Sequence, residues 1–226
     1  PARYAAQALR EALLRRGVTV VGEAASRHRM AWEGETGRPG DGARGATTLV
    51  SRSSWPLAED LRVINKASQN LHAELALREV ARQRRGVGSF EASRAELKAF
   101  LGEIGVGGGD YFFRDGSGLS RQNLVSPRAV VRLLGYLWKS GHRELWLDTL
   151  PVAGVDGTLH VRFVDSPAKE QVRAKTGTLT HVSALSGYLE AGGRPLAFSI
   201  LVNNYAGESG PIRKAMERIC GAIVLK

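Results

Sequence analysis

The sequence contains a single cysteine, Cys220, so no disulfide can form within the chain. Cys220 falls on the apolar side of a predicted C-terminal helix, where a free thiol behaves as a small core residue. No stretch reaches the roughly 20 consecutive apolar residues that a membrane-spanning helix requires, so no transmembrane segment is expected. A charged and then apolar signal region is also missing from the start of the sequence. Because the first residue is Pro1 rather than methionine, we expect a processed or truncated start, and the missing signal indicates nothing about the compartment.

The sequence also lacks residues spaced as the ligands of a protein-bound metal ion are. None of the five histidines has a cysteine or carboxylate at the separation that protein metal sites use. The sequence therefore predicts no metal and no cofactor. The histidines are His28, His72, His142, His160 and His181.

The formal charge of +10, with a pI near 10.2, raises the question of an acidic partner, because basic surface alone can bind nucleic acid. The 32 lysines and arginines are scattered, however, and the densest patch is Arg82-Gln83-Arg84-Arg85. That patch stands at the end of a predicted helix, where cations complement the helix dipole. No zinc-finger spacing or aromatic and glycine-rich nucleic-acid motif is present, so no nucleic-acid partner is predicted.

The first 46 residues form a predicted segment of their own. Apolar residues recur at helical spacing in residues 1–16, Gly17 ends that pattern, and residues 18–22 read as a strand. Residues 32–47 are rich in glycine and charge, which indicates a flexible loop. We expect a domain boundary here, with residues 1–46 before it and 47–226 after it.

The remainder of the chain changes from helical to strand-like character. A strand is expected at residues 47–53, and helices at about 54–66, 71–85, 93–105 and 127–140. Ser54 and Ser126 are the expected N-caps of the first and last of these helices, each with a proline following. Strands at 172–175, 182–190 and 196–203, with a turn at Gly192-Gly193, predict an antiparallel meander, and residues 209–225 predict a final helix. The pattern indicates an α/β fold, of the α+β kind.

Two short motifs carry the chemistry. Ser68-Gln69-Asn70 lies between two predicted helices, and Lys175-Thr176-Gly177, followed by Thr178, begins a strand-like segment. Together they are two of the three motifs of the penicillin-interacting serine acyltransferases, which also need Ser-x-x-Lys. The one Ser-x-x-Lys in the chain, Ser166-Pro167-Ala168-Lys169, follows the other serine motif, and its proline favours a loop over the helix start that the motif requires. The attacking serine is therefore expected outside this chain.

Acyl transfer from a peptide needs a nucleophile, a proton relay, an oxyanion hole and a cationic clamp for the substrate carboxylate. Ser68 can relay a proton, and the amide of Asn70 can hold a substrate amide. Because side chains alternate along a strand, Lys175 and Gly177 should share one face and Thr176 the other. Lys175 would add charge near the relay, and Gly177 would let a substrate backbone approach.

These motifs and two neighbouring ones resemble the class C penicillin-binding proteins, which are D-alanyl-D-alanine carboxypeptidases and endopeptidases of bacterial cell walls. The likeness covers the chain from about residue 47 onward. It rests on Asn65-Lys66-Ala67-Ser68-Gln69-Asn70-Leu71-His72-Ala73-Glu74, on Asp115-Gly116-Ser117-Gly118-Leu119-Ser120-Arg121-Gln122-Asn123, on Arg173-Ala174-Lys175-Thr176-Gly177-Thr178-Leu179 and on Leu185-Ser186-Gly187-Tyr188.

The resemblance implies a penicillin-binding transpeptidase or serine β-lactamase-like domain, with a helical cluster beside a five-stranded antiparallel sheet, incomplete at the N-terminus. It implies catalytic roles for Ser68, Asn70 and Lys175, and substrate binding by Thr176, Gly177 and Thr178, the two threonines holding the terminal carboxylate. Peptidoglycan stem peptides would be the substrates, β-lactams the inhibitors, and the missing N-terminal part of the same protein a partner. The expected location is the periplasm or cell envelope of a bacterium.

The sequence leaves several alternatives open. A non-catalytic module that keeps the cleft but has lost the nucleophile would look the same within this stretch, and carboxypeptidase and endopeptidase activity cannot be separated. Lys66 either adds charge to the cleft or is structural, and His181 either touches a ligand or is a packed residue. Asp115 is expected to cap its own glycine turn.

Overall fold

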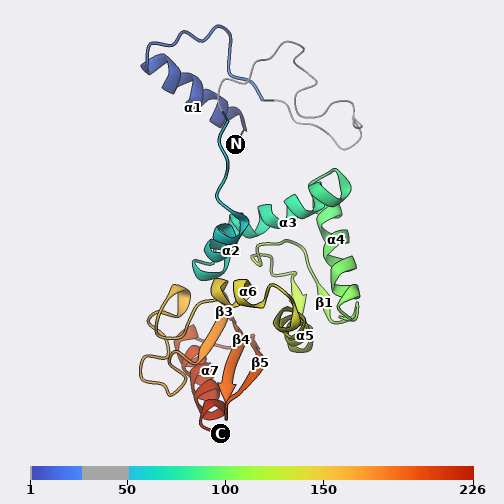
Figure 1. Cartoon of the computed structure of the whole chain (residues 1–226), viewed down its shortest axis with the longest axis vertical. Coiled ribbons are helices and arrows are strands. Elements are labelled where there is room, and N and C mark those ends of the chain that lie inside the picture. The colour runs from blue at the N-terminus through green and yellow to red at the C-terminus, as the bar shows by residue number, and fades with distance from the viewer. Residues whose placement is uncertain (1, 27–50) are drawn as a thin grey trace. The chain divides into compact units, whose positions relative to one another are not determined.

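A computed structural model of the chain describes residues 2–26 and 51–226 (Figure 1). The contacts divide the chain into two units, Pro1–Ser51 and Arg52–Lys226, which are described separately. The boundary expected at residues 46 and 47 and the glycine-rich loop lie outside the described residues. The division into residues 1–46 and 47–226 stays a prediction.

The first unit contains the helix α1 (Ala2–Arg15), as its periodicity predicts. None of its residues is buried within the described chain. The strand expected at residues 18–22 is not formed. A strand needs a neighbour to pair its backbone groups, and here the amide of Val18 instead donates to the carbonyl of Leu13 at 3.0 Å. Likewise residues 51–53, the described part of the strand expected at 47–53, adopt no strand.

The second unit begins with helices. They are α2 (Leu57–Lys66), α3 (Asn70–Arg85), α4 (Phe90–Glu103), α5 (Pro127–Lys139) and α6 (Arg143–Thr149). The hydroxyl of Ser126 accepts a hydrogen bond from the amide of Ala129 at 3.1 Å, which confirms this predicted cap. Ser54 does not cap α2, because the helix starts one residue after Pro56, which has no side-chain acceptor. The short helix α6 was not predicted.

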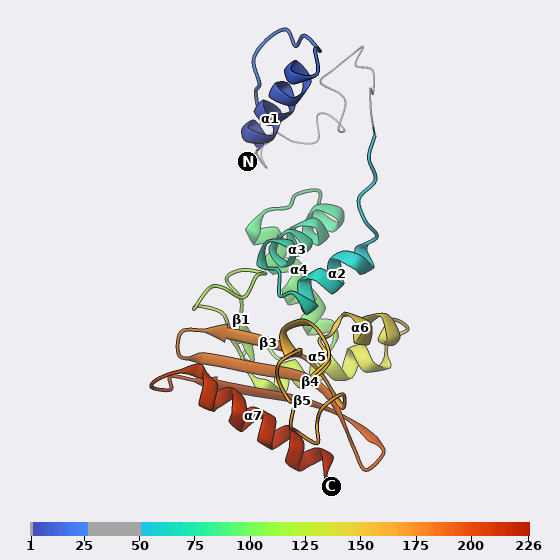
Figure 2. The ribbon, with the colours of Figure 1, turned by 90° about the vertical axis from the view of Figure 1, so that its left-hand side faces the viewer.

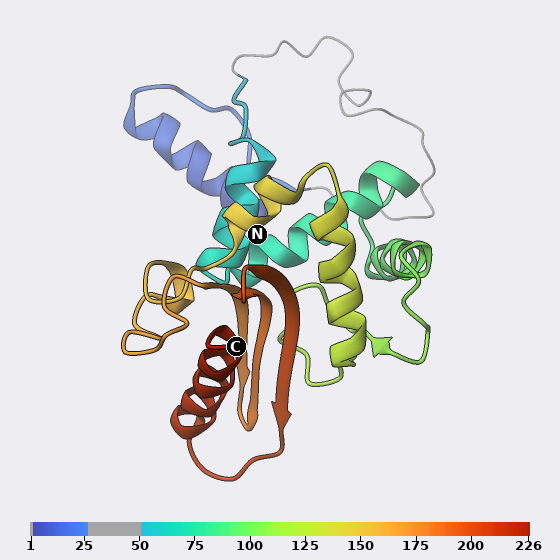
Figure 3. The same ribbon diagram turned by 60° about the horizontal axis from the view of Figure 1, so that its bottom comes forward.

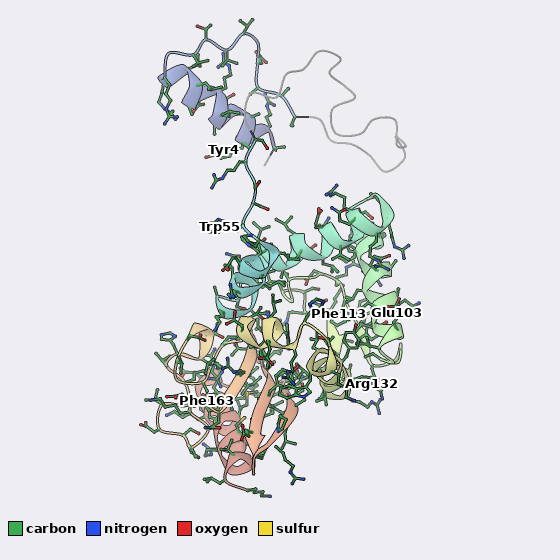
Figure 4. The ribbon with its side chains drawn as sticks, viewed as in Figure 1. Tyr4, Trp55, Glu103, Phe113, Arg132 and Phe163 are labelled. Atoms are coloured by element: carbon green, nitrogen blue, oxygen red, sulfur yellow. The ribbon has the colours of Figure 1, made fainter. Side chains whose placement is uncertain are left out.

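A small hydrophobic core includes residues of both α4 and α5. It contains Leu101, Val106 and Ala129, and Phe113, labelled in Figure 4, packs against it. A two-stranded pair, β1 (Tyr111–Phe112) with β2 (Leu124–Val125), lies between α4 and α5 in the sequence. This core fixes the segment between the two strands, which carries the Asp115 turn.

The C-terminal part forms the antiparallel meander that the sequence predicts. Its strands are β3 (Val172–Leu179), β4 (Val182–Ala191) and β5 (Arg194–Asn203), in the order β3-β4-β5. Gly192 and Gly193 turn the chain between β4 and β5 with φ of 54° and 74°, a backbone region that favours glycine. In the described residues this sheet has three strands rather than the five that the resemblance implied.

The two faces of the sheet are covered by different helices. The last helix, α7 (Ser209–Val224), lies along one face and α5 lies on the other (Figures 2 and 3). On the α7 face Val172 and Ala174 of β3 meet Met216 and Cys220, all buried. The prediction of a core Cys220 is therefore confirmed, and burial raises the pKa of its thiol to about 11.

The opposite face of the sheet is closed by an aromatic group. The phenol of Tyr188, on β4, donates to the carbonyl of Leu134 in α5 at 2.8 Å and accepts from the indole of Trp146 at 3.0 Å. Leu134 and Leu150 are buried beside it. Because residues alternate along a strand, the odd-numbered residues of β3, including Lys175, lie on this same side.

Candidate active site

The two motifs meet in space. The ammonium of Lys175, on β3, donates a hydrogen bond to the hydroxyl of Ser68 at 2.7 Å, although the residues are 107 positions apart. It also donates to the carbonyl of Thr176 at 2.8 Å. Ser68 holds a left-handed backbone, with φ of 58°, in the turn between α2 and α3. Because the ammonium donates to its oxygen, the Ser68 hydroxyl keeps its own proton free to donate elsewhere.

Asn70 is the first residue of α3, rather than part of the connecting loop as the sequence indicated. The turn before it is closed by Gln69, whose side-chain oxygen accepts from the amide of Leu71 at 3.4 Å. Among the described residues, the hydrogen bonds do not engage the Asn70 amide, which is partly buried beside Ser68. The contact of this amide with a substrate amide stays a prediction.

The position of Lys175 changes its acidity. Burial disfavours the charged form and lowers the pKa of Lys175 from 10.5 to about 8. With this pKa, Lys175 can exchange a proton near pH 8. A lysine with this property beside a hydroxyl is the combination expected of an acid–base site.

Lys66, at the end of α2, is structural. Its ammonium pairs with the carboxylate of Asp156, whose other oxygen accepts from the amide of Val152 at 2.9 Å. Burial pushes the pKa of Asp156 upward, but these hydrogen bonds outweigh it and hold the pKa below its usual value. The next residue, Gly157, approaches the carbonyl of Lys66 so closely that an added Cβ would lie 2.8 Å from it.

The same loop also reaches the second motif. Thr158, within the 3-10 turn Gly157–Leu159, is hydrogen-bonded through its hydroxyl to that of Thr176 at 2.9 Å. The loop is thus tied to the end of α2 through Asp156 and to β3 through Thr158. It therefore contacts the segments that carry both motifs.

The outer edge of β3 is only partly covered. Residues 151–153 pair with the beginning of β3. The carbonyl of Val172 accepts from the amide of Ala153, and the amide of Ala174 donates to the carbonyl of Pro151, both at 2.9 Å. In an antiparallel ladder, every second residue directs both backbone groups to the same edge. The backbone groups of Thr176 and Thr178 therefore face the outer edge, which has no strand partner among the described residues.

Gly177 lies between these two threonines, on the side of Lys175. A Cβ at this position would lie 3.2 Å from the Cβ of Ala184 on the neighbouring strand. Close packing within the sheet is therefore one reason for glycine here. Approach of a substrate backbone is a second reason, and it stays a prediction.

Thr178 is exposed and borders a cavity of about 390 Å³ at the end of β3. The guanidinium of Arg213, on α7, lies 3.4 Å from the Thr178 hydroxyl. The cavity is lined by Thr178, Leu179, Thr180, His181, Tyr205, Gly207 and Ser209. Sequence reasoning missed Arg213 and Tyr205, because neither belongs to a motif or stands near one in the sequence.

His181, at the hairpin turn, is exposed, with φ of 59°. Its ring meets that of Tyr205 edge to face at 6.2 Å. The phenol of Tyr205 is in turn hydrogen-bonded to the buried hydroxyl of Ser183 at 2.9 Å. His181 is thus exposed rather than packed in the core, and its contact with a ligand stays a prediction.

The Asp115 turn is linked to the hairpin between β3 and β4. The Asp115 carboxylate accepts hydrogen bonds from the amides of Gly118 and Ser120, both at 2.7 Å, which is the predicted turn cap. Burial raises the pKa of Asp115, but hydrogen bonds, first that from Asn123, bring it below the usual value. The following Arg121 donates twice to the carbonyl of Thr180 at 2.9 Å, so the turn is fastened to the β3–β4 hairpin.

Ser166 is in a turn rather than at a helix start. Its hydroxyl accepts from the amide of Ala168 at 3.2 Å and lies against Gly221 of α7, on the sheet face away from Lys175. This position does not fit a nucleophile that works with Ser68.

Within residues 2–26 and 51–226, no cluster of histidine, cysteine or acidic side chains is suited to hold a metal ion. In the same ranges, no helix is both long and apolar enough to cross a membrane.

Comparison with known proteins identifies the family. The model of the D-Ala-D-Ala carboxypeptidase 3 (S13) family matches residues 1–222. The chain belongs to this family. A D-alanyl-D-alanine carboxypeptidase from an Actinomadura species is 39% identical over 222 residues, which are 96% of this chain and 39% of that protein. The D-alanyl-D-alanine carboxypeptidase DacB of Haemophilus influenzae is 35% identical over 162 residues, or 70% of this chain and 34% of that protein.

Solved structures of a penicillin binding protein and of a β-lactamase share the fold. Penicillin binding protein 4 (dacB) of Haemophilus influenzae, complexed with a β-lactam, matches 99% of this chain with a TM-score of 0.84 and 27% identity, over 51% of that protein. The TLA-1 extended spectrum β-lactamase matches 74% of this chain and 63% of that chain at 17% identity and a TM-score of 0.56, a likeness of fold alone. The predicted α+β class is confirmed. The chain spans well under two thirds of the length of the curated relatives named above.

Proposed function

We propose that this chain is part of a serine-type D-alanyl-D-alanine carboxypeptidase or endopeptidase that acts on peptidoglycan stem peptides. The chain carries the Ser-x-Asn and Lys-Thr-Gly motifs, and the attacking serine lies outside it. The observation that carries the proposal is the 2.7 Å hydrogen bond between Lys175 and Ser68 beside the open edge of β3. Membership of the S13 family supports the same reaction class.

The proposed chemistry is transfer of a proton through Ser68. An external serine attacks the peptide carbonyl, and the leaving amine must receive a proton as the bond to carbon breaks. The Ser68 hydroxyl donates that proton and recovers one from the nucleophile's base. Lys175, with its pKa near 8, stabilises the negative charge that develops on the Ser68 oxygen.

The substrate lies along the outer edge of β3. An extended peptide that adds a strand to an open edge gains backbone hydrogen bonds, here with Thr176 and Thr178. The amide of Asn70 orients the substrate amide, Gly177 allows close approach, and the hydroxyls of Thr176 and Thr178 receive the terminal carboxylate. This arrangement is supported by the partial cover of β3, whose pairing with residues 151–153 stops before Lys175.

β-Lactams would inhibit the complete protein, because they mimic the acylating amide. A related protein of Haemophilus influenzae has been solved with a β-lactam bound. A protein that acts on stem peptides would work in the periplasm or cell envelope, and the missing N-terminal part would complete the site.

A non-catalytic peptidoglycan-binding module is the second candidate. It is favoured by one observation, that the Ser-x-x-Lys sequence in this chain lies in a turn behind the sheet. The two candidates differ only in whether a nucleophile is supplied from outside the chain.

Labelling with a fluorescent penicillin separates them. This chain and a version of the protein extended upstream are incubated with the probe, denatured, separated by electrophoresis and peptide-mapped. Label on the extended version alone supports the enzyme with an upstream serine. Label on Ser68 or Ser166 of this chain would refute the assignment of the nucleophile, and no label on either protein would favour the binding module.

A further inference from the structure

A cavity of about 380 Å³ is lined by residues of α4 and β1, which are neighbours in Figure 1 and carry neither the Ser68 nor the Lys175 motif. Its volume is in the range of small-molecule sites in proteins. The lining includes three aromatic side chains, two cations and one carboxylate, which are Tyr111, Phe112, Phe113, Arg94, Lys98 and Glu91. The proposed function uses none of these residues.

The aromatic part of the cavity is anchored on the small core that includes residues of α4 and α5. Tyr111 and Phe113 pack against that core, and their rings stack with centroids 5.5 Å apart. Phe112, between them, is 42% exposed. Because the packed neighbours hold the backbone on both sides of Phe112, its ring is an exposed apolar surface on a fixed support.

The guanidinium of Arg94 lies over two aromatic rings. Its carbon Cζ is 5.2 Å from the centroid of Phe112 and 5.8 Å from that of Phe90. A guanidinium can stack on a ring while its five N–H donors, which lie in its own plane, stay available for other contacts. Stacking therefore restrains Arg94 without using its hydrogen-bonding capacity.

The positive charge of the cavity is not balanced by ion pairs. Lys98 follows Arg94 by four residues, so both lie on one face of α4. None of the ion pairs of residues 2–26 and 51–226 includes either of them. Glu96 of the same helix pairs instead with Arg84 and Arg85.

The mixture of side chains indicates the kind of ligand. Two cations against the single carboxylate of Glu91 favour an anionic group. The Glu91 carboxylate can in turn accept hydrogen bonds from hydroxyl groups. An exposed aromatic ring, whose face is electron-rich, suits the C–H face of a sugar ring.

We propose that this cavity binds a sugar ring that carries a carboxylate. The ring packs on Phe112, its hydroxyls pair with Glu91, and Arg94 and Lys98 bind the carboxylate. The choice of sugar rests on the proposed function, because peptidoglycan contains such an acidic sugar, N-acetylmuramic acid. Its carboxylate is free only where no stem peptide is attached, so the site should favour the sugar without a stem peptide.

The test compares three compounds in NMR titrations of the 226-residue chain. N-acetylmuramic acid has both the ring and the charge. Its N-methyl amide keeps the ring without the charge and mimics the bond to a stem peptide, and lactate keeps a carboxylate without the ring. The acid should bind most tightly and should shift the signals of Tyr111 and Phe112.

Two variants separate the contributions of charge and ring. Arg94→Met removes the cation, and Phe112→Leu removes the aromatic ring but keeps an apolar side chain. Arg143→Met is the matched control, because Arg143 also lies over an aromatic ring, that of Trp138 at 5.1 Å, but belongs to α6. Circular dichroism confirms that each variant is folded.

Arg94→Met should weaken binding of the acid about tenfold, through loss of a charge-assisted hydrogen bond, and leave binding of the amide unchanged. Phe112→Leu should weaken binding of both the acid and the amide about fivefold, because both carry the ring. Arg143→Met should bind all three compounds as the unaltered chain does.

The inference is overturned if the unaltered chain does not bind the acid, binds the amide or lactate as tightly, or keeps its preference for the acid in Arg94→Met. If Arg94→Met does not fold, Arg94→Lys decides, and an unaltered preference there would count against a guanidinium contact. Each of these failures leaves the proposed function in place. Penicillin labelling tests that function through the upstream nucleophile, and it should be normal in the upstream-extended Arg94→Met protein.

Discussion

Lys66 and Asp156, 90 residues apart, form an ion pair that fastens the end of α2 to the loop before β3. Ser68 follows Lys66 by two residues, and the same loop holds Thr176 through Thr158. The Ser68 and Lys175 motifs are therefore both in contact with one shared segment. We expect this segment to help hold Lys175 at hydrogen-bonding distance from Ser68.

Replacing Lys66 tests this arrangement. Lys66→Met should lower the free energy of unfolding by about 1 kcal/mol, because a partly exposed ion pair with a hydrogen bond is lost. It should also broaden the NMR signals of Ser68, whose turn loses its anchor. Urea unfolding measures the first effect. Lys214→Met, at an exposed lysine of α7, is the control, and equal stability of both variants would show that the pair does not anchor α2.

The acidity of Lys175 predicts a pH dependence of stability. Its pKa is about 8 in the folded chain and 10.5 ordinarily, so between these values the unfolded chain binds more protons. Stability should therefore rise with pH from about 8 to 10.5, by up to about 3 kcal/mol from this residue. Below pH 8 the cost of burying the ammonium is fully present.

The free energy of unfolding is measured with urea at several pH values for the unaltered chain and for Lys175→Met, whose side chain at this position cannot titrate. The difference in free energy of unfolding between the two proteins should change across this window. Parallel pH profiles would contradict a lowered pKa of Lys175.

Gly187 should tolerate no side chain. A Cβ there would lie 2.1 Å from the carbonyl oxygen of Arg173 and 2.6 Å from the Cα of Ala174, both backbone atoms of β3. Gly187→Ala should cost about 3 kcal/mol or more, because the sheet must separate to admit it. Thermal unfolding is the measurement. Gly210→Ala in α7, where a Cβ meets open space, should leave the melting temperature nearly unchanged, and similar values for both variants would disprove the clash.

Ser68 should control the rate of acylation in the upstream-extended protein. Ser68→Ala removes the proton relay and should slow labelling by fluorescent penicillin by roughly 10²–10⁴-fold. Lys175 would keep its hydrogen bond to the Thr176 carbonyl, so the fold should persist. Ser166→Ala, behind the sheet, should label at the normal rate. Normal labelling of Ser68→Ala would rule out the relay.

Local patterns predicted several helices and the meander, because a helix or hairpin is specified by residues close in sequence. Ser126 with Pro127, for example, defines the start of α5, and Gly192-Gly193 defines the turn after β4. The strand β3 was predicted only as far as Lys175. It continues to Leu179 because its polar second half pairs with β4, as Thr178 does with Ser183.

The sequence by itself determined the two triplets Ser68-Gln69-Asn70 and Lys175-Thr176-Gly177, and it predicted that they are motifs of an acyltransferase, because motif residues are recognisable wherever they lie. Only the tertiary structure decided that Lys175 touches Ser68, that Lys66 is structural and that Arg213 faces Thr178. It also decided that residues 18–22 form no strand. The physical reason is the same in each case: these outcomes depend on contacts between distant residues, and hydrogen bonds and burial across such distances leave no periodic signal in the sequence.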